Sequence, residues 1–333
     1  MASGQFTTRS VTVIALMKTS AIALTLVFSA HGQCAVYPDK PIRLILPYPP
    51  GGGTDLIARP LAQRLSEQLG QQVVVDNRGG ANGNIGMQMA ARAQPDGYTI
   101  VLALTAQLAI NPAFYPKLPY EPEGDYEPIA YLGSAPYLLT ANPGVTARTI
   151  SELIALAKAR PGTIAFASSG TGGIPHLAGE LLKNMAGIDM IHVAYKGGGP
   201  AIIDVIGGQV QLNFAVISAG LPHMKSGKLR AIAVTSAQRF PVIGNVPAIA
   251  ETLSGYEIST WYGVLAPAHT PQQVVRRLNA EIVKCLTVTE MNNYLLGNGF
   301  APDTAASMQL REQIRRELVK WAKIVRDSGV SAE

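Results

Sequence analysis

The chain has 333 residues, of which 47% are apolar and 15% charged, and this is enough to bury the core of two domains. Its formal charge of +5 comes from 27 basic and 22 acidic residues, and the basic residues are scattered along the sequence. This argues against a nucleic-acid-binding protein, because such proteins gather their basic residues in a patch or stripe.

The first 35 residues differ from the rest because they hold two basic residues and no acidic one. Their apolar run, AIALTLVFSA at 21–30, is too short for a stable membrane anchor. A basic start, a short apolar centre and small residues after it are typical of a secretory signal. We expect residues 1–35 to be a signal peptide, with cleavage after Gly32 or Ala35; the alternative is a buried core helix.

The two cysteines do not suggest a disulfide framework, even in an exported protein. Cys34 lies at the edge of the signal, where it could carry a lipid, although Gln33 fits a lipoprotein cleavage site poorly. Cys285 lies in a helical pattern, and we expect it to be a small buried apolar residue.

Strands and helices are predicted to alternate along the rest of the chain. The expected strands are the apolar runs IRLIL (42–46), QVVVD (72–76), YTIVLA (98–103), TIAFA (163–167), DMIHVAY (189–195), VQLNFA (210–215) and LRAIAVT (229–235). Helical spacing of apolar residues follows from Ile57 to Leu69, after the sequence TPQQ at 270–273, and from Leu310 to Val325. This alternation predicts mostly parallel sheets in an α/β fold.

No low-complexity linker divides the chain. If it forms two domains, we expect it to cross between them through ordered strands. The candidate crossings are SAPYLLTANP (134–143) and GYEISTWYGVLAP (255–267). Trp261 and Tyr262 lie in the second of these, where they either line a cleft or belong to the core.

Four glycine-rich loops each follow a predicted strand and precede a helical pattern. They are PPGGGTD (49–55), NRGGANGNIG (77–86), ASSGTGGIPH (167–176) and YKGGGP (195–200). Unpaired backbone N–H groups and the helix dipole both attract anions to such places, and open α/β sheets bind ligands at these loops. The loops therefore predict an anion site, although each could also be a tight turn.

Phosphate is disfavoured as the anion. A phosphate-binding Walker loop needs a lysine and then Ser or Thr after its second glycine, and none of the four loops has that order. The dinucleotide pattern GxGxxG fails as well, because position 175 is Pro. A small carboxylate is the natural remaining candidate.

Catalytic and metal sites find little support. Ser168, Ser169 and His176 suggest a hydrolase, but the SSGTG sequence lacks the GxSxG elbow. The histidines have no Cys or carboxylate partners at metal-ligand spacing. We expect Asp55 and Asp204 to be helix N-terminal or structural groups, and we expect no catalytic residue, metal or cofactor.

Stretches along the whole mature chain carry a resemblance to a known family. They include YPDKPIRLILPYPPGGGTD (37–55), VVVDNRGGANGNIG (73–86), AQPDGYTIVLA (93–103), NPAFYPKLPY (111–120), FASSGTGGIPHLAGELL (166–182), VAYKGGGPAIIDVIGGQV (193–210), SGKLRAIAVTSAQR (226–239) and WAKIVRDSGV (321–330). With these residues the chain resembles the Bug/TctC family, the extracytoplasmic solute-binding receptors of tripartite tricarboxylate transporters.

The resemblance implies a periplasmic-binding-protein-like fold with two α/β lobes, two crossover segments and an interlobe cleft. We expect lobe 1 to comprise residues 36–137 and 256–333, and lobe 2 residues 138–255. Members of this family look like carboxylate binders that use backbone N–H groups, hydroxyls and ordered waters without an obligatory arginine.

The resemblance also implies the ligand-binding residues. From lobe 1 these are Tyr48, Gly52, Gly53, Thr54, Asp55, Ala81, Asn82, Thr105 and Ala106. From lobe 2, Ser168, Gly170, Thr171 and Gly172 would close on the ligand, and His176, Tyr195, Lys196 and Asp204 would support or line that side.

One departure from the family pattern bears on the ligand. After the strand VQLNF, related proteins often place Asp or Asn, whereas this chain has Ala215 and Val216. The ammonium group of an amino acid would therefore lack a partner. An aliphatic or aromatic dicarboxylate becomes the favoured ligand.

These observations together predict an exported, periplasmic, monomeric receptor that is not an enzyme. It would deliver a small organic carboxylate to the membrane subunits of a tripartite tricarboxylate transporter, and it would bind no nucleic acid. The alternatives are a sensory receptor for the same ligands and a hydrolase that uses Ser168 or Ser169.

Overall fold

The computed structural model describes Met1 and residues 37–304 and 307–329. The predicted signal peptide, 1–35, and Cys34 therefore lie outside the described residues apart from Met1. The chain separates into two compact units, Met1–Asp39 and Lys40–Glu333, and the architecture below is that of the second unit.

The second unit contains ten strands among its described residues. In chain order they are β1 (Ile42–Leu46), β2 (Val73–Asn77), β3 (Thr99–Leu104), β4 (Tyr126–Ala141), β5 (Ala165–Ser168), β6 (Ile191–Ala194), β7 (Leu212–Val216), β8 (Arg230–Val234), β9 (Ser259–Pro267) and β10 (Ala301–Pro302). All seven strands predicted from apolar runs are present, each within two residues of its expected bounds.

The helices alternate with these strands. They are α2 (Gly53–Leu69), α3 (Asn84–Ala91), α4 (Asn111–Phe114), α5 (Ile150–Ala159), α6 (Ile174–Ala186), α7 (Gly198–Ile206), α8 (Ile217–Lys225), α9 (Gln272–Thr287), α10 (Thr289–Gly297) and α11 (Leu310–Ser328). Short helical turns are η1 (Ala81–Gly83), η2 (Ala106–Ile110), η3 (Pro241–Ile243), η4 (Ile249–Glu251) and η5 (Ser307–Gln309).

The strands form one path in the order β2-β1-β3-β9-β4-β7-β5-β6, with β8 and β10 paired to β4. The outer strands are parallel, as the alternating pattern predicts: β1 with β2 and β3, and β5 with β6 and β7. The central strands β4 and β9 are antiparallel to each other and to their neighbours. Both run through the segments predicted as crossings.

Strand β4 changes partners along its length. Residues Tyr126 to Pro136 pair with β9, and residues Tyr137 to Ala141 pair with β7. Most of this second segment, from Leu138 on, also pairs with β8. We call β2, β1, β3, β9 and residues 126–136 of β4 the first half of the sheet. The rest of β4 with β7, β8, β5 and β6 is the second half. One strand thus belongs to both halves.

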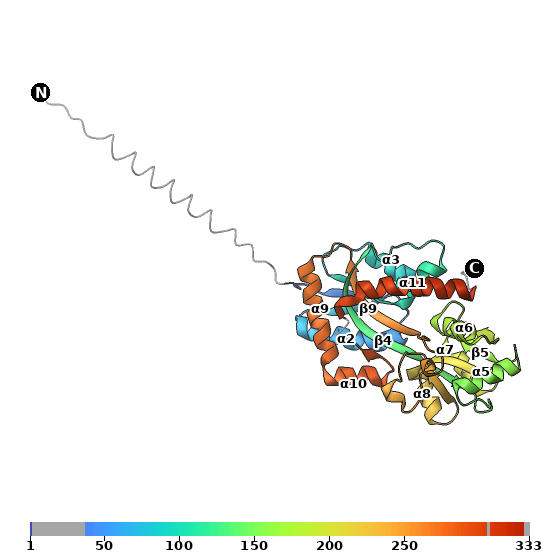
Figure 1. The fold of residues 1–333 in the computed structure, drawn as a ribbon. Helices are drawn as coiled ribbons and strands as arrows, with labels where there is room; N and C mark the ends of the chain where they lie inside the picture. The colour runs from blue at the N-terminus through green and yellow to red at the C-terminus, as the bar shows by residue number, and fades with distance from the viewer. Residues whose placement is uncertain (2–36, 305–306, 330–333) are drawn as a thin grey trace. The chain divides into compact units, whose positions relative to one another are not determined.

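Helices cover each half (Figure 1). Figure 1 shows α2, α9 and α10 around the first half and α5, α6, α7 and α8 around the second. The apolar side of α2 is buried, as its spacing predicts, from Ile57 to Leu69. Burial of four such side chains contributes roughly 1.5–3 kcal/mol each.

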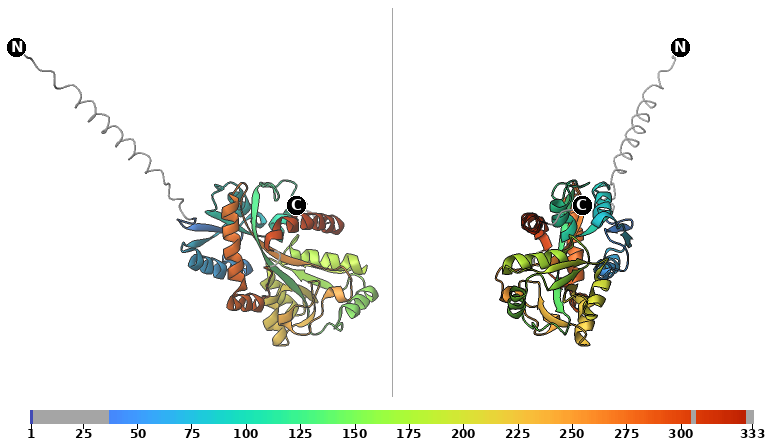
Figure 2. Two further views of the ribbon diagram at one scale, coloured as in Figure 1. Left: turned by 60° about the vertical axis from the view of Figure 1, so that its left-hand side comes forward. Right: turned by 90° about the vertical axis from the view of Figure 1, so that its right-hand side faces the viewer.

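Helix α11 links the two sets of helices. Its residues Leu310, Ile314, Trp321 and Val325 are buried at helical spacing, as predicted. Views from two further sides show its C-terminal part beside α6 of the second half (Figure 2). Since α11 follows the first-half strand β9 in the chain, it gives the first half a contact with the second outside the sheet.

One sequence expectation away from the glycine loops can be checked. Cys285 is free and fully buried in α9, as expected for a small apolar residue. Among the described helices, none combines the length and the hydropathy that spanning a bilayer requires.

Candidate functional site

A cavity of about 860 Å³ lies where all four predicted glycine loops meet. Residues of the first half and of the second half both line it. The wall comprises Tyr48, Pro49, Pro50, Gly51, Gly52, Gly53, Thr54, Asn82, Leu104, Ala106, Ile110, Phe114, Tyr115, Tyr137, Ser169, Gly170, Thr171, Gly172, Gly173, Ile174, Pro175, Gly197, Gly198, Val216, Thr260 and Tyr262. We call this cavity the cleft.

Three helices begin at the cleft wall. Helix α2 starts after Gly52, α6 starts after Gly173 and α7 starts after Gly197. The first backbone N–H groups of a helix have no partner within it, and its N-terminus carries about half a positive charge. Three such ends at one cavity make it attractive to an anion without any basic side chain.

The first loop, 49–55, is shaped from behind by Asp55. This buried carboxylate accepts a hydrogen bond from the Gly51 amide and another from Asn77 Nδ2 at 3.3 Å. Asp55 is therefore not on the cleft wall. Among the described residues, no backbone partner is recorded for the amides of Gly52, Gly53 and Thr54. These amides remain available to a ligand.

The second predicted loop meets the cleft through Asn82. Ala81 and Asn82 both have positive φ angles, 47° and 52°, which are uncommon outside glycine. The Asn82 carbonyl accepts a hydrogen bond from Gln107 Nε2 at 2.9 Å, and its side-chain amide donates to Asn111 Oδ1 at 2.7 Å. The polar residues behind the wall thus hold a strained turn in place.

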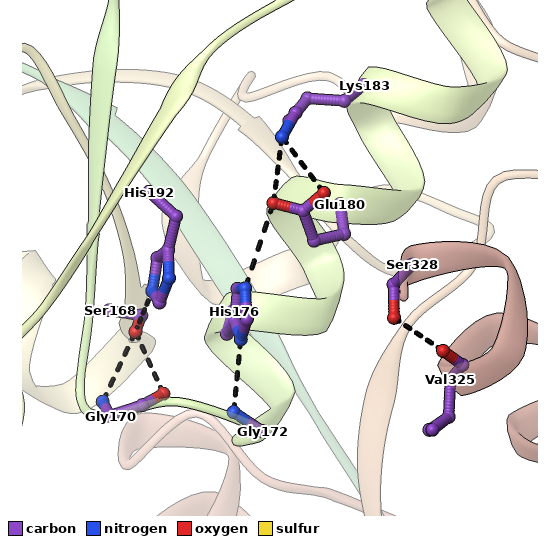
Figure 3. Close-up of polar contacts among 9 residues, drawn as sticks. All are labelled: Ser168, Gly170, Gly172, His176, Glu180, Lys183, His192, Val325 and Ser328. Carbon is purple, nitrogen blue, oxygen red and sulfur yellow. Dashed lines mark hydrogen bonds and ion pairs between the residues drawn. The ribbon is translucent and has the colours of Figure 1, made fainter. Parts of the chain in front are cut away.

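The loop at 168–173 is fixed by Ser168 (Figure 3). Its fully buried hydroxyl donates to the Gly170 carbonyl at 3.0 Å, accepts from the Gly170 amide at 3.2 Å and lies 2.7 Å from His192 Nε2. The Gly172 amide donates to His176 Nδ1 at 3.0 Å. Because Nδ1 is an acceptor, the neutral His176 ring carries its proton on Nε2.

The two histidines behind this loop are stacked. The rings of His176 and His192 lie 3.6 Å apart with an angle of 9° between their planes. Burial and the neighbouring His176 lower the pKa of His192 to about 4. Burial alone would raise the pKa of Glu180, but hydrogen bonds from His176 and Lys183 lower it. His192 is therefore neutral near pH 7.

Tyrosine and threonine hydroxyls form the floor of the cleft. The Tyr137 hydroxyl lies 2.9 Å from Thr260 Oγ1, and the Tyr48 hydroxyl accepts from Gln107 Nε2 at 2.8 Å. Burial raises the pKa of Tyr137 to about 12 and also raises the pKa values of Tyr48 and Tyr262. All three hydroxyls therefore keep their protons at neutral pH.

Nine of the predicted site residues line the cleft and eight do not. Those on the wall are Tyr48, Gly52, Gly53, Thr54, Asn82, Ala106, Gly170, Thr171 and Gly172. Those elsewhere are Asp55, Ala81, Thr105, Ser168, His176, Tyr195, Lys196 and Asp204.

The predicted residues off the wall mostly support it. Thr105 Oγ1 accepts a hydrogen bond from the Trp261 amide at 2.8 Å and so joins the end of β3 to β9. The Tyr195 hydroxyl donates to Asp204 Oδ2 at 2.8 Å, which ties the fourth loop to α7. Lys196 is exposed and contributes no charge to the cleft wall.

Sequence reasoning did not assign the residues of the floor and of the apolar wall to the ligand site. Tyr137, Thr260 and Tyr262 come from the crossing strands, and the sequence left Tyr262 equally placed in a cleft or a core. Phe114 comes from α4, and its ring lies against Gly172 of the second half. The two predicted crossings could have indicated the floor residues, because a cleft between two lobes lies next to the segments that join them.

The cleft wall contains no Asp, Glu, Lys, Arg or His. No group of three or more metal-ligating side chains occurs in the part of the chain that the structure describes. Ser168 is fully buried and engaged with the loop, so its hydroxyl does not face the cavity. The arrangement provides unpaired amides and neutral hydroxyls, which are groups that can donate hydrogen bonds to an anion.

Comparison with known proteins shows the family to which the chain is similar. Residues 57–330 match the model of the tripartite tricarboxylate transporter family receptor, TctC. The chain is 39% identical over 297 residues to the protein BugT of Bordetella pertussis, a match that covers 88% of this chain and 90% of BugT.

Solved structures share the fold. The structure of R. palustris Rpa4515 with adipate is 32% identical with a TM-score of 0.78, covering 89% of this chain and 99% of that one. The periplasmic binding protein BugD is 33% identical with a TM-score of 0.75, covering 89% and 100%. The predicted fold class, two α/β lobes joined by two crossover segments with a cleft between them, is confirmed.

Proposed function

The chain belongs to the receptor family of tripartite tricarboxylate transporters, and from that premise we propose that it is an exported protein that captures a small organic carboxylate in its cleft and delivers it to the membrane subunits of such a transporter. The proposal includes removal of residues 1–35 and a periplasmic location. It also includes a monomeric state, with residues 36–137 and 256–333 as lobe 1 and 138–255 as lobe 2.

A single observation carries the proposal: three helix N-termini with unpaired amides meet at a cavity whose wall has no Asp, Glu, Lys, Arg or His. Such a site favours an anion through backbone donors. The lobe boundary near residue 137 is supported by β4, which changes partners there. A relative's structure that contains adipate supports a carboxylate as the anion.

The side chains of the wall support a ligand that is apolar along its body. Val216, which stands where relatives often have Asp or Asn, lines the cleft with Leu104, Ile110 and Phe114. An ammonium group placed against these residues would lose its water without gaining an acceptor. We therefore favour an aliphatic or aromatic dicarboxylate over an amino acid.

A catalytic role has no support in the cleft. A hydrolase would need Ser168 or Ser169 to reach a substrate with a base beside it. Ser168 is the serine with a histidine neighbour, and it is fully buried. Ser169 lines the cleft, but among the described residues no hydrogen bond is recorded for its side chain.

The test is binding to residues 36–333 measured by isothermal calorimetry. The panel should include aliphatic and aromatic mono- and dicarboxylates, citrate, several amino acids and inorganic phosphate. We expect heat with at least one carboxylate, and stabilisation of the folded state by about 2.7 kcal/mol at a ligand concentration 100 times the dissociation constant. Heat with phosphate or amino acids alone would contradict the proposal.

A substitution in the first loop sharpens this test. No atom lies within 4 Å of a side chain built on Gly53, and its φ angle is not positive, so Gly53→Leu should fold normally. The leucine would occupy the space in front of the amides and should weaken carboxylate binding at least tenfold. Gly297→Leu is the matched control, because Gly297 is equally open and lies at the end of α10. Equal affinity in both variants would refute the assignment of the loop.

A further inference from the structure

Tyr262 differs from the other hydroxyl-bearing residues of the cleft floor. It lies on β9 and is 8% exposed, so its side chain is more than nine-tenths buried. Its hydroxyl has no hydrogen-bond partner among the described residues. By contrast, Tyr48 is bonded to Gln107 and Tyr137 to Thr260. Because Tyr262 lines the cleft, this unpaired hydroxyl is a donor that a bound ligand can use.

The Tyr262 ring is held in place by its surroundings. Phe300, itself buried, packs edge-on against it, with ring centres 5.2 Å apart and an angle of 82° between the planes. This packing restricts rotation of the ring, so the hydroxyl cannot move to another hydrogen-bond acceptor. Because burial keeps the hydroxyl protonated, it remains a hydrogen-bond donor across the physiological pH range.

A ligand bound in the cleft can accept a hydrogen bond from the Tyr262 hydroxyl. Tyr262 lies on the wall of the same cleft as the free amides of Gly52 to Thr54, but on a different element. If the loops hold one carboxyl group of the ligand, the rest of the ligand lies against the floor of the cleft. Since the wall has no cationic side chain, the groups there that can recognise a second polar atom are neutral.

We propose that Tyr262 is a specificity-determining residue that donates a hydrogen bond to a second oxygen on the bound carboxylate, either a hydroxyl or a further carboxyl. This inference rests on the proposed function and names the class of ligand: carboxylates with an acceptor oxygen away from the carboxyl group that the loops hold. A carboxylate without that oxygen leaves the Tyr262 hydroxyl buried and unpaired, which lowers its affinity.

The experiment uses two pairs of probes that each differ in one oxygen-bearing group. Malate and succinate differ by a hydroxyl, and adipate and hexanoate differ by a carboxyl. Calorimetry on residues 36–333 should show a preference of roughly tenfold for the oxygen-bearing member of at least one pair. The pair that shows it identifies the oxygen that Tyr262 recognises.

Tyr262→Phe removes the hydroxyl and keeps the ring against Phe300. We expect this variant to lose the preference, with weaker binding of the oxygen-bearing probe and little change for its partner. Tyr294→Phe, at an exposed tyrosine of α10, is the control and should behave as the wild type. A melting temperature for each variant separates loss of contact from loss of fold.

The outcomes distinguish the inference from the function on which it rests. Heat from carboxylates with an unchanged preference in Tyr262→Phe would overturn the role of Tyr262 and leave the receptor function intact. Equal affinity within both pairs in the wild type would also overturn it. Absence of heat with every carboxylate would contradict the proposed function itself.

Discussion

The two halves of the molecule present glycine loops of similar sequence to one cleft, but they use glycine differently. In the loop 49–55, side chains built on Gly51, Gly52 and Gly53 would meet no atom within 4 Å. In the loop 168–173, a side chain on Gly172 would lie 2.5 Å from the Phe114 ring. In the first loop, glycine leaves the space in front of the backbone empty. In the second, glycine at position 172 allows contact between the halves.

The two loops are also held differently. One carboxylate, Asp55, organises the first loop from its own helix. The second depends on Ser168 and two histidines from different elements, α6 and β6 (Figure 3). Comparable backbone donors can therefore be positioned by a local contact or by a network that forms only with the folded sheet.

The largest contrast should come from Gly172→Val against Gly53→Val. Gly172 has a φ angle of 74°, which disfavours a branched side chain, and the valine would clash with Phe114. We expect a loss of about 3 kcal/mol of unfolding free energy, from backbone strain and overpacking together. Gly53→Val should cost less than about 1 kcal/mol.

Urea unfolding of both variants measures this difference. Adding Phe114→Ala to Gly172→Val should recover part of the stability, because it removes the clash but not the strain. If the two glycine variants were equally stable, the contrast between the loops would be wrong.

A medium effect is expected from Ser168→Ala. The substitution leaves the Gly170 amide and His192 Nε2 without their buried partner, and we expect a cost of about 2 kcal/mol. The neighbouring Ser169→Ala is the control, because no side-chain hydrogen bond of Ser169 is recorded among the described residues. Thermal unfolding compares the stability of the two variants. An equally large loss of stability in Ser169→Ala would show that the Ser168 hydrogen bonds are not what stabilises the loop.

The smallest expected effect is a loss of folding stability at acidic pH. It should come from His192, which lies behind the second loop. His192 has an ordinary pKa of 6.5, which the folded protein lowers to about 4. The unfolded chain therefore binds more protons between these values, and stability is complete above about pH 6.5 and falls as the pH drops toward 4. Glu180 loses its contribution only below its ordinary pKa of 4.5.

Melting temperatures from pH 7.5 to 5 test this, since that window lies above the titration of Glu180. The wild type should lose a few degrees, and His192→Gln, which keeps a side-chain amide near Ser168, should lose less. An identical pH dependence in both proteins would exclude His192 as the group responsible.

Much of the fold could be predicted because its signals are local. Buried parallel strands read as continuous apolar runs, so β1, β3 and β5 were found within two residues. Glycine loops between strands and helices likewise predicted the positions of the free amides. The central strand β4 was only partly found, because an antiparallel strand with prolines at 128 and 136 breaks the apolar pattern.

The rest of the site depends on contacts between residues distant in sequence. The bond between Ser168 and His192 joins residues 24 apart and exists because β5 pairs with β6 in one register. Phe114 reaches Gly172 from the other half. No periodicity in a single sequence fixes such a register or contact, so the sequence could not show that Ser168 lies behind the wall or that His176 contacts the Gly172 amide.

The absence of Asp, Glu, Lys, Arg and His from the described cleft wall has a consequence for the environment in which the protein works. Amides do not titrate, and the tyrosine hydroxyls of the floor hold their protons well above neutral pH. Acidification of the surroundings would therefore act on the carboxyl groups of the proposed ligand and on His192 behind the second loop, while the charge of the cleft wall stays the same.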